Sequence, residues 1–295
     1  MHYETVIYRP PREAYTPMLP VTSGCSHNKC GFCNMYADVP FRIYKEDIVR
    51  GYLQQIKAYQ GEARRIYLVG GDPFVLSANR LLALIDLIKS YLPKIETVTM
   101  YASVLNIMQK SDDELEQLRT AGVNQLYIGL ETGCDSLLKK LNKGSTAADA
   151  VTQLNRLTAA GMTYGVIIMT GLAGAGKAVA NAKATAAVMN QIAARVLYCN
   201  SLVVMDNTPL GEALRRGQYK EAGEYERLEE LLTLFKELHP RSKLLVNSYH
   251  ASNTLNINAE VPDQQAETIQ YIENILKQTS PAEMDRLFNR KNMRI

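Results

Sequence analysis

Three cysteines lie within nine residues of one another near the start of the chain. The segment TSGCSHNKCGFCNMY places Cys25, Cys30 and Cys33 at a Cys-x4-Cys-x2-Cys spacing. Clustered thiolates are soft metal ligands, and three of them on a four-iron cubane leave one iron without a protein ligand. An iron with an open position can bind a substrate or cofactor. The spacing therefore predicts one 4Fe-4S cluster, held by these three cysteines.

Other kinds of cysteine site compete with this interpretation. A ferredoxin-like carrier closes its cluster with a fourth cysteine, and a structural zinc site wants a fourth Cys or His at short spacing. His27, inside the loop, is the nearest such side chain. Cys134 and Cys199 are too scattered for a second cluster; each is expected to be a buried small side chain, with Cys134 a remote candidate for a radical-relay thiol. An odd count of five cysteines argues against a disulfide framework.

From about residue 17 the chain alternates short apolar runs with amphipathic helical patterns, which is typical of βα units and a parallel sheet. Strands are expected at 18–24, 65–71, 96–103, 124–131, 163–171 and 195–204. Helices are expected at 45–59, 77–91, 111–121, 146–160, 178–193 and 222–238. The cysteine segment follows the first strand, and loops at the carboxyl ends of parallel strands build active sites.

These elements predict an α/β fold, a partial (β/α)6 TIM-like barrel with a C-terminal α/β extension. We expect a lead-in at 1–16, the barrel at 17–215 and the extension at 216–295, which closes the barrel. The extension contains a further expected strand at 243–250 and a helix from about residue 263.

Composition gives weaker indications about location and partners. The chain is 46% hydrophobic and 21% charged, and no apolar run approaches the roughly 20 residues that span a bilayer. Its first residues include charged side chains and prolines instead of an unbroken apolar stretch, so we expect a cytoplasmic protein without a membrane partner. The tail at 286–295 is basic, but a net charge of +3 does not by itself favour nucleic acid.

The cysteine triplet after the first strand, the aromatic Phe32 before its last cysteine and the βα alternation together resemble the radical SAM superfamily. The commonest spacing there has three residues between the first two cysteines, whereas this chain has four. In this longer gap the chain is similar to stand-alone proteins related to the elongator catalytic subunit and oxygen-independent coproporphyrinogen oxidase. The resemblance extends over about residues 17–250.

The resemblance implies a set of residues that contact S-adenosylmethionine. In the family a Gly-Gly-Glu-Pro turn holds the amino group, and here the second strand ends in Gly70, Gly71, Asp72 and Pro73. Oxygen acceptors suit an ammonium with three donors, and glycines let the backbone approach closely. Taken alone, these four residues indicate only a turn.

Residues after the later strands extend the implied site. By the same likeness Glu131 accepts from the ribose hydroxyls and Lys143 pairs with the methionine carboxylate, although a surface salt bridge is the simpler interpretation of Lys143. Ser103 is a weaker ribose-side candidate or a simple cap. Ile168 and Gly171 fit an adenine-binding surface or ordinary barrel core.

Some candidates for substrate contacts lie further along the chain. Asp206 and Asn207 follow the sixth strand and face the barrel mouth or form a turn. His250 closes the substrate side or is structural.

The implied function is that of a radical SAM enzyme. Its cofactors are a 4Fe-4S cluster and S-adenosylmethionine, which it cleaves to a 5′-deoxyadenosyl radical that abstracts hydrogen from an unidentified substrate. A flavodoxin or ferredoxin would supply electrons, and a small-molecule substrate is favoured over tRNA. The first alternative is a non-catalytic iron-sulfur electron carrier or sensor.

A glycine-rich turn supports a second alternative. Gly171 to Lys177, GLAGAGK, matches most of a phosphate-binding P-loop between a strand and a helix. Ala178 replaces the Ser or Thr that binds magnesium, and no convincing Walker-B strand is present. Nucleotide binding is therefore disfavoured, and the Lys177→Ala variant tests it.

Overall fold

The computed structural model describes residues 6–288 and divides the chain into two compact units. The first unit takes in Met1–Asn28, Met35–Ile128 and Arg156–Tyr164. The second takes in Lys29–Asn34, Gly129–Asn155 and Gly165–Ile295.

The first unit is built on parallel strands in the order β1-β4-β5-β6. These are β1 (Met18–Pro20), β4 (Arg65–Val69), β5 (Thr97–Ala102) and β6 (Leu126–Glu131), whose last three residues belong to the second unit. A short antiparallel pair joins β2 (Thr22–Ser23) to β3 (Arg42–Ile43). The helices are α1 (Glu46–Gln60), α2 (Ala78–Tyr91), α3 (Val104–Met108) and α4 (Asp112–Ala121), with 3-10 turns η1 (Pro11–Glu13) and η2 (Pro73–Val75).

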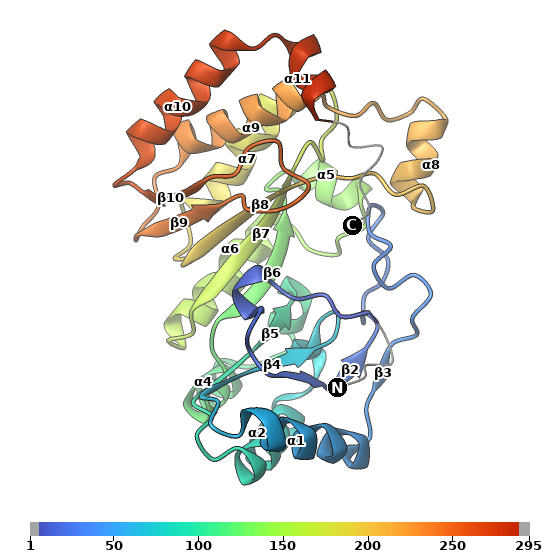
Figure 1. Ribbon diagram of the computed structural model, residues 1–295, viewed down its shortest axis with the longest axis vertical. Helices are drawn as coiled ribbons and strands as arrows, with labels where there is room; N and C mark the ends of the chain where they lie inside the picture. The colour runs from blue at the N-terminus through green and yellow to red at the C-terminus, as the bar shows by residue number, and fades with distance from the viewer. Residues whose placement is uncertain (1–5, 289–295) are drawn as a thin grey trace. The chain divides into compact units, whose positions relative to one another are not determined.

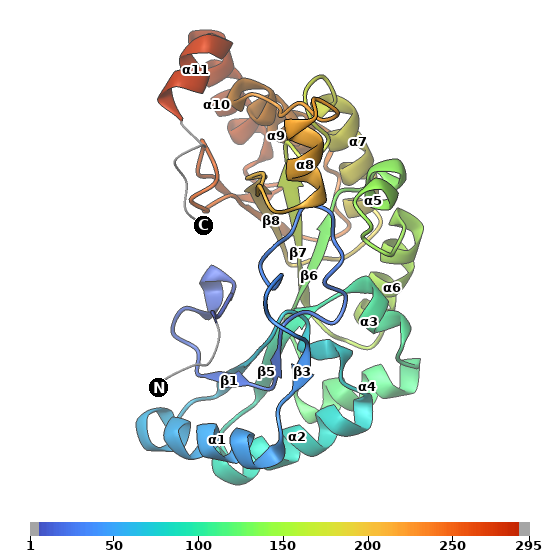
Figure 2. The same ribbon diagram turned by 90° about the vertical axis from the view of Figure 1, so that its right-hand side faces the viewer.

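Helices α1, α2 and α4 lie along one side of these strands (Figure 2). Leu53 and Ile56 of α1 are fully buried, as are Ile66 and Leu68 of β4. Successive strand residues point to opposite faces, so Tyr67, between Ile66 and Leu68, points away from the face that they share.

Helix α4 shows how local sequence sets an element's ends in this unit. The Ser111 side chain accepts from Glu114 N while the Glu114 side chain accepts from Ser111 N, which forms a capping box. The helix stops at Gly122, whose φ of 116° is a conformation that favours glycine.

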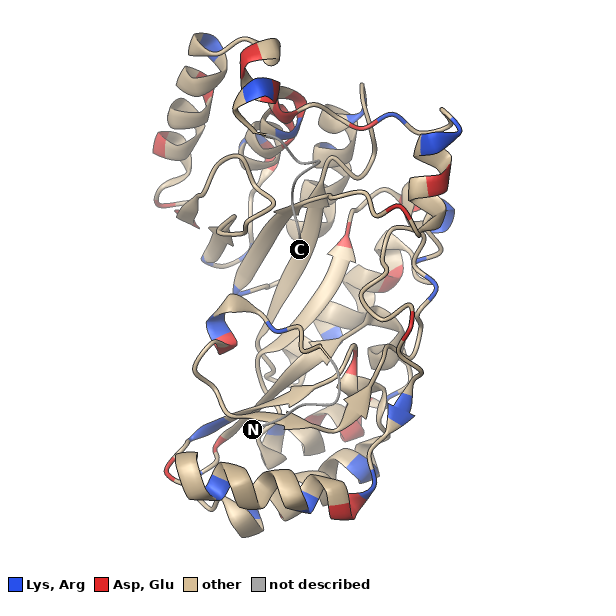
Figure 3. Cartoon of the chain, turned by 45° about the vertical axis from the view of Figure 1, so that its right-hand side comes forward, with Lys and Arg blue, Asp and Glu red and all other residues tan. Residues whose placement is uncertain are grey.

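The second unit continues the parallel pattern with β7 (Tyr164–Thr170), β8 (Val196–Ser201) and β9 (Leu244–Asn247), to which β10 (Asn258–Val261) adds an antiparallel edge. Neither β7 nor β8 contains a charged residue, and charged side chains gather on helices and loops (Figure 3). Strands of that composition are typical of parallel sheets covered on both faces.

The helices of this unit cover its strands. They are α5 (Asp135–Lys140), α6 (Ala147–Ala159), α7 (Ala178–Met189), α8 (Pro209–Arg215), α9 (Glu224–Glu237), α10 (Gln265–Gln278) and α11 (Pro281–Leu287). Helix α9 packs against α7, α10 and α11. Helices α7, α9 and α10 lie together over one face of β7 to β9 (Figure 1). The last residues of α6 belong to the first unit.

The expected α/β class is confirmed, since each unit contains neighbouring parallel strands joined by helical connections. The expected strand at 18–24 is two short strands, β1 and β2, because β2 turns away to pair with β3. The expected strand at 243–250 is β9, parallel to β8. The boundaries at residues 16 and 215 stay predictions.

No helix within residues 6–288 is long and apolar enough to cross a membrane. Most of the basic tail, residues 289–295, lies outside the described residues.

Candidate cofactor-binding site

The Gly70–Pro73 turn of the first unit lies against the segment that carries Cys25. Gly71 N donates to Gly24 O over 2.8 Å, and a Cβ on Gly71 would lie 2.7 Å from Cys25 Cβ. Gly70 has φ 152°, and a Cβ there would meet Thr22 Oγ1 at 1.9 Å. The two glycines are therefore required to bring this turn against the cysteine segment.

Asp72 is buried and holds the residue that follows Cys25. Its carboxylate accepts from Ser26 N at 2.9 Å and also from the Ser26 hydroxyl. Burial raises the pKa of Asp72, while the bonds from Ser26 oppose that shift. Two ionised oxygens offer about four acceptor positions, so the bonds from Ser26 and from the Asn106 side chain still leave the carboxylate capacity for an ammonium group.

Two further residues of the first unit support this turn, and sequence reasoning did not single them out. Lys110 is buried, donates to Phe74 O over 2.7 Å and stands 4.3 Å from the centre of the Phe74 ring. Burial lowers its pKa to about 8. Asn106 completes a capping box with Ser103 at the start of α3, so the structure assigns Ser103 a capping role. Its ribose contact stays a prediction.

The second unit holds the loop with Cys30 and Cys33 by backbone hydrogen bonds. Gly31 N donates to Leu141 O over 2.7 Å, and Gly31 O accepts from Leu210 N over 2.8 Å. Phe32 packs, partly buried, against the hydrophobic cluster that includes Leu141. The aromatic residue before the last cysteine therefore anchors the loop.

Glu131 and Lys143 form a nearly buried ion pair in the same unit. Lys143 Nζ lies 2.7 Å from Glu131 Oε1, and the two side chains are 15% and 10% exposed, so this is not a surface salt bridge. A Cβ on Gly129 would lie 2.3 Å from Glu131 Oε1, so the pair requires a glycine there. Burial lowers the pKa of Lys143, but Glu131 and the Cys30 and Cys33 thiols raise it more, so it stays charged.

The end of β7 has a different explanation from the one that sequence suggests. Ile168 is buried. Gly171 has φ 78°, and a Cβ there would meet Arg227 Nη1 at 2.3 Å. The structure thus requires glycine at 171 because a guanidinium from α9 occupies the space. Contact of either residue with adenine stays a prediction.

The P-loop-like turn is filled by a carboxylate of the chain itself. Glu226 Oε1 accepts from Gly176 N at 2.5 Å and from Lys177 N at 3.1 Å, the kind of amides that hold phosphate in a P-loop. A cavity of about 450 Å³ beside this turn is lined by Glu226, Glu229 and Asp285. Such a lining repels phosphate, so the geometry disfavours nucleotide binding.

The remaining candidates have local partners. Asn207 accepts from Asn34 over 2.7 Å, and Asp206 O accepts from Arg215. His250 Nδ1 lies 2.7 Å from Ser252 Oγ, and burial lowers its pKa.

The two cysteines outside the loop differ in accessibility. Cys199 is buried, which raises its pKa, and Cys134 is partly accessible. No contact in the described residues assigns either thiol a role in catalysis.

The donor set fits a 4Fe-4S cluster. Cys25, Cys30 and Cys33 are all partly accessible, and the positive charge of Lys143 interacts with the thiols of Cys30 and Cys33. Within residues 6–288 no three His, Cys, Asp or Glu side chains gather tightly enough for a single metal ion. Each thiolate of a cubane binds a different iron, so cluster ligands are spread more widely than that.

Comparison with known proteins gives both family and fold. Residues 19–177 match the radical SAM superfamily. The heme chaperone HemW of Lactococcus lactis subsp. lactis (strain IL1403) is 29% identical over 142 residues, which are 46% of this chain and 36% of that protein. The chain thus covers only about a third of the length of this curated relative.

Two solved structures show the same fold. One is the archaeal Methanocaldococcus infernus Elp3 with an N-terminal deletion, at TM-score 0.55 and 13% identity over 88% of this chain and 63% of that one. The other is methylornithine synthase (PylB), at TM-score 0.54 and 15% identity over 92% and 85%. At these identities the likeness concerns the fold alone, and the expected partial TIM-like barrel is the fold of the matched superfamily.

Proposed function

Because this chain belongs to the radical SAM superfamily, we propose that it cleaves S-adenosylmethionine reductively and that the resulting 5′-deoxyadenosyl radical removes hydrogen from a substrate. The superfamily uses a 4Fe-4S cluster, which supplies the electron for this cleavage when bound, together with S-adenosylmethionine. The observation that carries the proposal is the nearly buried Lys143–Glu131 pair beside the thiols of Cys30 and Cys33.

Cys25, Cys30 and Cys33 are the proposed cluster ligands. Backbone hydrogen bonds between Gly31 and both Leu141 and Leu210 fix the loop between the second and third cysteine, so contacts within the second unit hold this part of the proposed donor set. The open iron of a three-cysteine cluster is the feature that separates this site from a closed electron carrier.

The turn after β4 is the proposed acceptor of the amino group of S-adenosylmethionine. Asp72 is held against the cysteine segment by Ser26, and Gly70 and Gly71 let this turn lie close to that segment. An ammonium group donates three hydrogen bonds, and this oxygen-rich turn offers acceptors of the matching kind. Pro73 begins η2 and stops the backbone from continuing the strand.

Lys143 is the proposed partner of the methionine carboxylate, and Glu131 of the ribose hydroxyls. Lys143 uses one of its three donors on Glu131, which leaves two for a ligand carboxylate. Because its pKa is raised, it carries that charge throughout the physiological pH range.

A non-catalytic iron-sulfur protein is the second candidate. The relative from Lactococcus lactis bears the name heme chaperone, and the match covers only part of its length. A protein of that kind would keep the cluster and release no 5′-deoxyadenosine. The reductant, for which flavodoxin or ferredoxin is expected, the cytoplasmic location, and a small molecule in preference to tRNA as substrate all remain parts of the proposal.

The deciding experiment is anaerobic reconstitution with iron and sulfide, followed by dithionite and S-adenosylmethionine, with 5′-deoxyadenosine measured by mass spectrometry. We expect formation by the wild type and by Cys134→Ala, which removes a thiol outside the triplet, and none by Cys30→Ala. A wild type that builds a four-iron cluster but forms no 5′-deoxyadenosine under excess reductant would favour the non-catalytic candidate.

A further inference from the structure

Glu230 of α9 is a buried carboxylate that accepts hydrogen bonds from two other elements of the second unit. It is 4% exposed. Its Oε2 accepts from Gly171 N at the end of β7, and its Oε1 accepts from Asn181 Nδ2 of α7, each over 2.7 Å. A carboxylate buried at this depth is costly unless it is hydrogen-bonded, and here both oxygens have a donor.

The hydrogen bonds continue from Asn181 to the end of β6. Asn181 Oδ1 accepts from Thr132 Oγ1 over 2.5 Å, and Thr132 is fully buried. Thr132 Oγ1 in turn accepts from Cys134 N over 3.0 Å. Thr132 directly follows Glu131, whose φ of 67° is uncommon for a residue other than glycine. The chain of bonds therefore fixes the backbone next to a strained position that carries a proposed cofactor contact.

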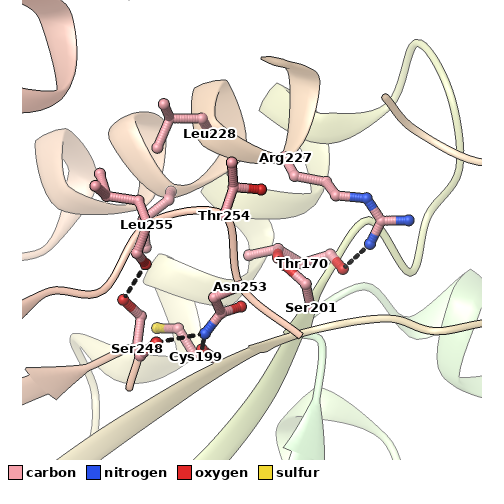
Figure 4. A pocket seen from close by; sticks show the side chains of 10 residues that line it. Thr170, Cys199, Ser201, Arg227, Leu228, Ser248, Asn253, Thr254 and Leu255 are labelled. Carbon is pink, nitrogen blue, oxygen red and sulfur yellow. Dashed lines mark hydrogen bonds between the residues drawn. The ribbon is translucent and has the colours of Figure 1, made fainter. Parts of the chain in front are cut away.

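Arg227, one turn before Glu230 on α9, fixes the neighbouring strand ends. Its Nη1 donates to Thr170 O, the last residue of β7, over 3.2 Å (Figure 4). It also donates to Leu202 O, just after β8, over 3.0 Å, so it joins the ends of these two strands. The cavity beside it, lined by Thr170, Ser201 and Asn253 among others, has about 20 Å³, which holds about one water. These side chains thus act on the backbone and have no room to bind a ligand themselves.

We propose that Glu230 is a positioning residue for S-adenosylmethionine, which acts through Gly171 directly and through Asn181 and Thr132 on Glu131, without touching the cofactor. This inference rests on the proposed function. By this inference α9, in the C-terminal part of the chain, fixes the ends of β6 and β7, where the proposed cofactor contacts Glu131 and Gly171 lie.

The charge on Glu230 gives the proposal a pH signature. Burial raises its pKa to about 7, although Asn181, Gly171 and Arg227 lower it in part. The other titratable groups near it are Glu226 on its own helix, Cys199 on β8 and Tyr219 before α9. The ionised carboxylate accepts both bonds strongly, so affinity for S-adenosylmethionine should rise as the pH increases through about 7.

The test compares Glu230→Gln with Glu229→Gln, which changes a more exposed carboxylate on the same helix. Glutamine replaces one carboxylate oxygen by an NH2 group, which cannot accept the hydrogen bond that Asn181 Nδ2 donates to Glu230 Oε1. On reconstituted protein we expect Glu230→Gln to raise the Kd of S-adenosylmethionine about tenfold, the size of one lost charge-assisted hydrogen bond, with kcat at saturation changed less than about twofold. The rise of affinity through pH 7 should flatten. Glu229→Gln should match the wild type.

A second readout needs neither cluster nor cofactor. Hydrogen exchange followed by mass spectrometry should show faster exchange in peptides that contain Gly171 and Gly133–Cys134 for Glu230→Gln. In the double variant with Asn181→Asp and Glu230→Gln, the glutamine NH2 group can donate to the aspartate carboxylate. This variant should recover both the protection from hydrogen exchange and the affinity for S-adenosylmethionine. If Glu230→Gln does not fold, Thr132→Val breaks the same chain of bonds at its far end and should weaken binding in the same direction.

The outcomes separate the two claims. If the wild type forms 5′-deoxyadenosine while Glu230→Gln and Thr132→Val bind S-adenosylmethionine and exchange like Glu229→Gln, the positioning role is overturned and the proposed function stands. If the wild type neither binds nor cleaves S-adenosylmethionine, the proposed function fails, and the positioning role fails with it.

Discussion

Lys143 Nζ lies 2.7 Å from Oε1 of Glu131, a residue that ends β6 with φ 67°. Gly129 leaves the space that this pair occupies, and Thr132 anchors the backbone on the other side. A positive φ at a non-glycine residue costs on the order of 1–3 kcal/mol. The surrounding contacts hold this conformation in place, which is common where a side chain must be aimed at a ligand.

Replacing Lys143 should weaken cofactor binding. Lys143→Met keeps the length of the side chain but removes the ammonium group, so it leaves Glu131 unpaired and the methionine carboxylate without its proposed partner. We expect the Kd of S-adenosylmethionine to rise about tenfold or more, as for the loss of a hydrogen bond to a charged group. Equilibrium binding measures this, with Lys140→Met, an exposed lysine of α5, as the control. Equal affinities in the two variants would contradict the assignment.

Replacing a cluster ligand should remove the iron-sulfur chromophore. After anaerobic reconstitution, Cys33→Ala should lose the absorbance at about 400 nm that thiolate-bound clusters show, because two cysteines cannot hold a stable cubane. Cys134→Ala should keep it, since that thiol lies outside the triplet. A Cys33→Ala protein with full iron content and unchanged absorbance would mean that another side chain is the third ligand.

Sequence patterns predicted the α/β fold because buried strands and helix ends are marked by apolar runs and capping residues within short segments of chain. Strands such as β4 and β8 are short apolar runs, and the capping box at Ser111 marks a helix start. The cysteine loop and the Gly70–Pro73 turn could also be predicted, because each lies within a few residues of chain.

Contacts between residues far apart in the chain could not be predicted from the sequence. Gly171 looked like a close approach to a ligand, whereas Arg227, 56 positions later, is what excludes a side chain there. Glu230 and Asn181 carried no signal, because nothing in the sequence distinguishes a buried polar residue of a helix from an exposed one. Lys110 similarly gave no hint that it would hold Phe74 O.

Two tyrosines of the first unit should respond oppositely to loss of their hydroxyl groups. Tyr67 is fully buried, and its hydroxyl has no hydrogen-bond partner among residues 6–288, whereas the Tyr127 hydroxyl donates to the buried Glu13 carboxylate. We expect Tyr67→Phe to leave the free energy of unfolding unchanged or raise it by about 1 kcal/mol, and Tyr127→Phe to lower it by about 1.5–3 kcal/mol. Urea denaturation compares them. Equal losses in both variants would show that the Tyr67 hydroxyl has a partner.

Nucleotide should not bind at the glycine-rich turn after β7. Glu226 Oε1 already accepts from Gly176 N and Lys177 N, and phosphate would have to displace that carboxylate. We expect the wild type and Lys177→Ala to show the same melting temperature with and without Mg-ATP. If Mg-ATP raised the melting temperature of the wild type but not that of Lys177→Ala, the nucleotide-binding alternative would be supported.

The stability of the protein should contain a pH-dependent contribution from Glu230. Burial raises the pKa of this carboxyl to about 7 in the folded protein, against 4.5 as its ordinary value. The folded state therefore binds more protons between these two values, and the free energy of unfolding falls as the pH rises through that window, becoming flat above it. The contribution is on the order of 3 kcal/mol, from a shift of about 2.5 pKa units at 1.36 kcal/mol per unit.

The measurement is the urea unfolding free energy of the wild type and Glu230→Gln from pH 5 to pH 8. Glutamine does not titrate, so the difference between the two proteins should change with pH in favour of the wild type at the acidic end. Glu229→Gln serves as the control. Burial also raises the pKa of this less buried carboxyl, so its curve should differ from that of the wild type less than the curve of Glu230→Gln does. Parallel curves for Glu230→Gln and the wild type would mean that Glu230 titrates alike in the folded and unfolded chain, and that its carboxylate is already charged throughout this range.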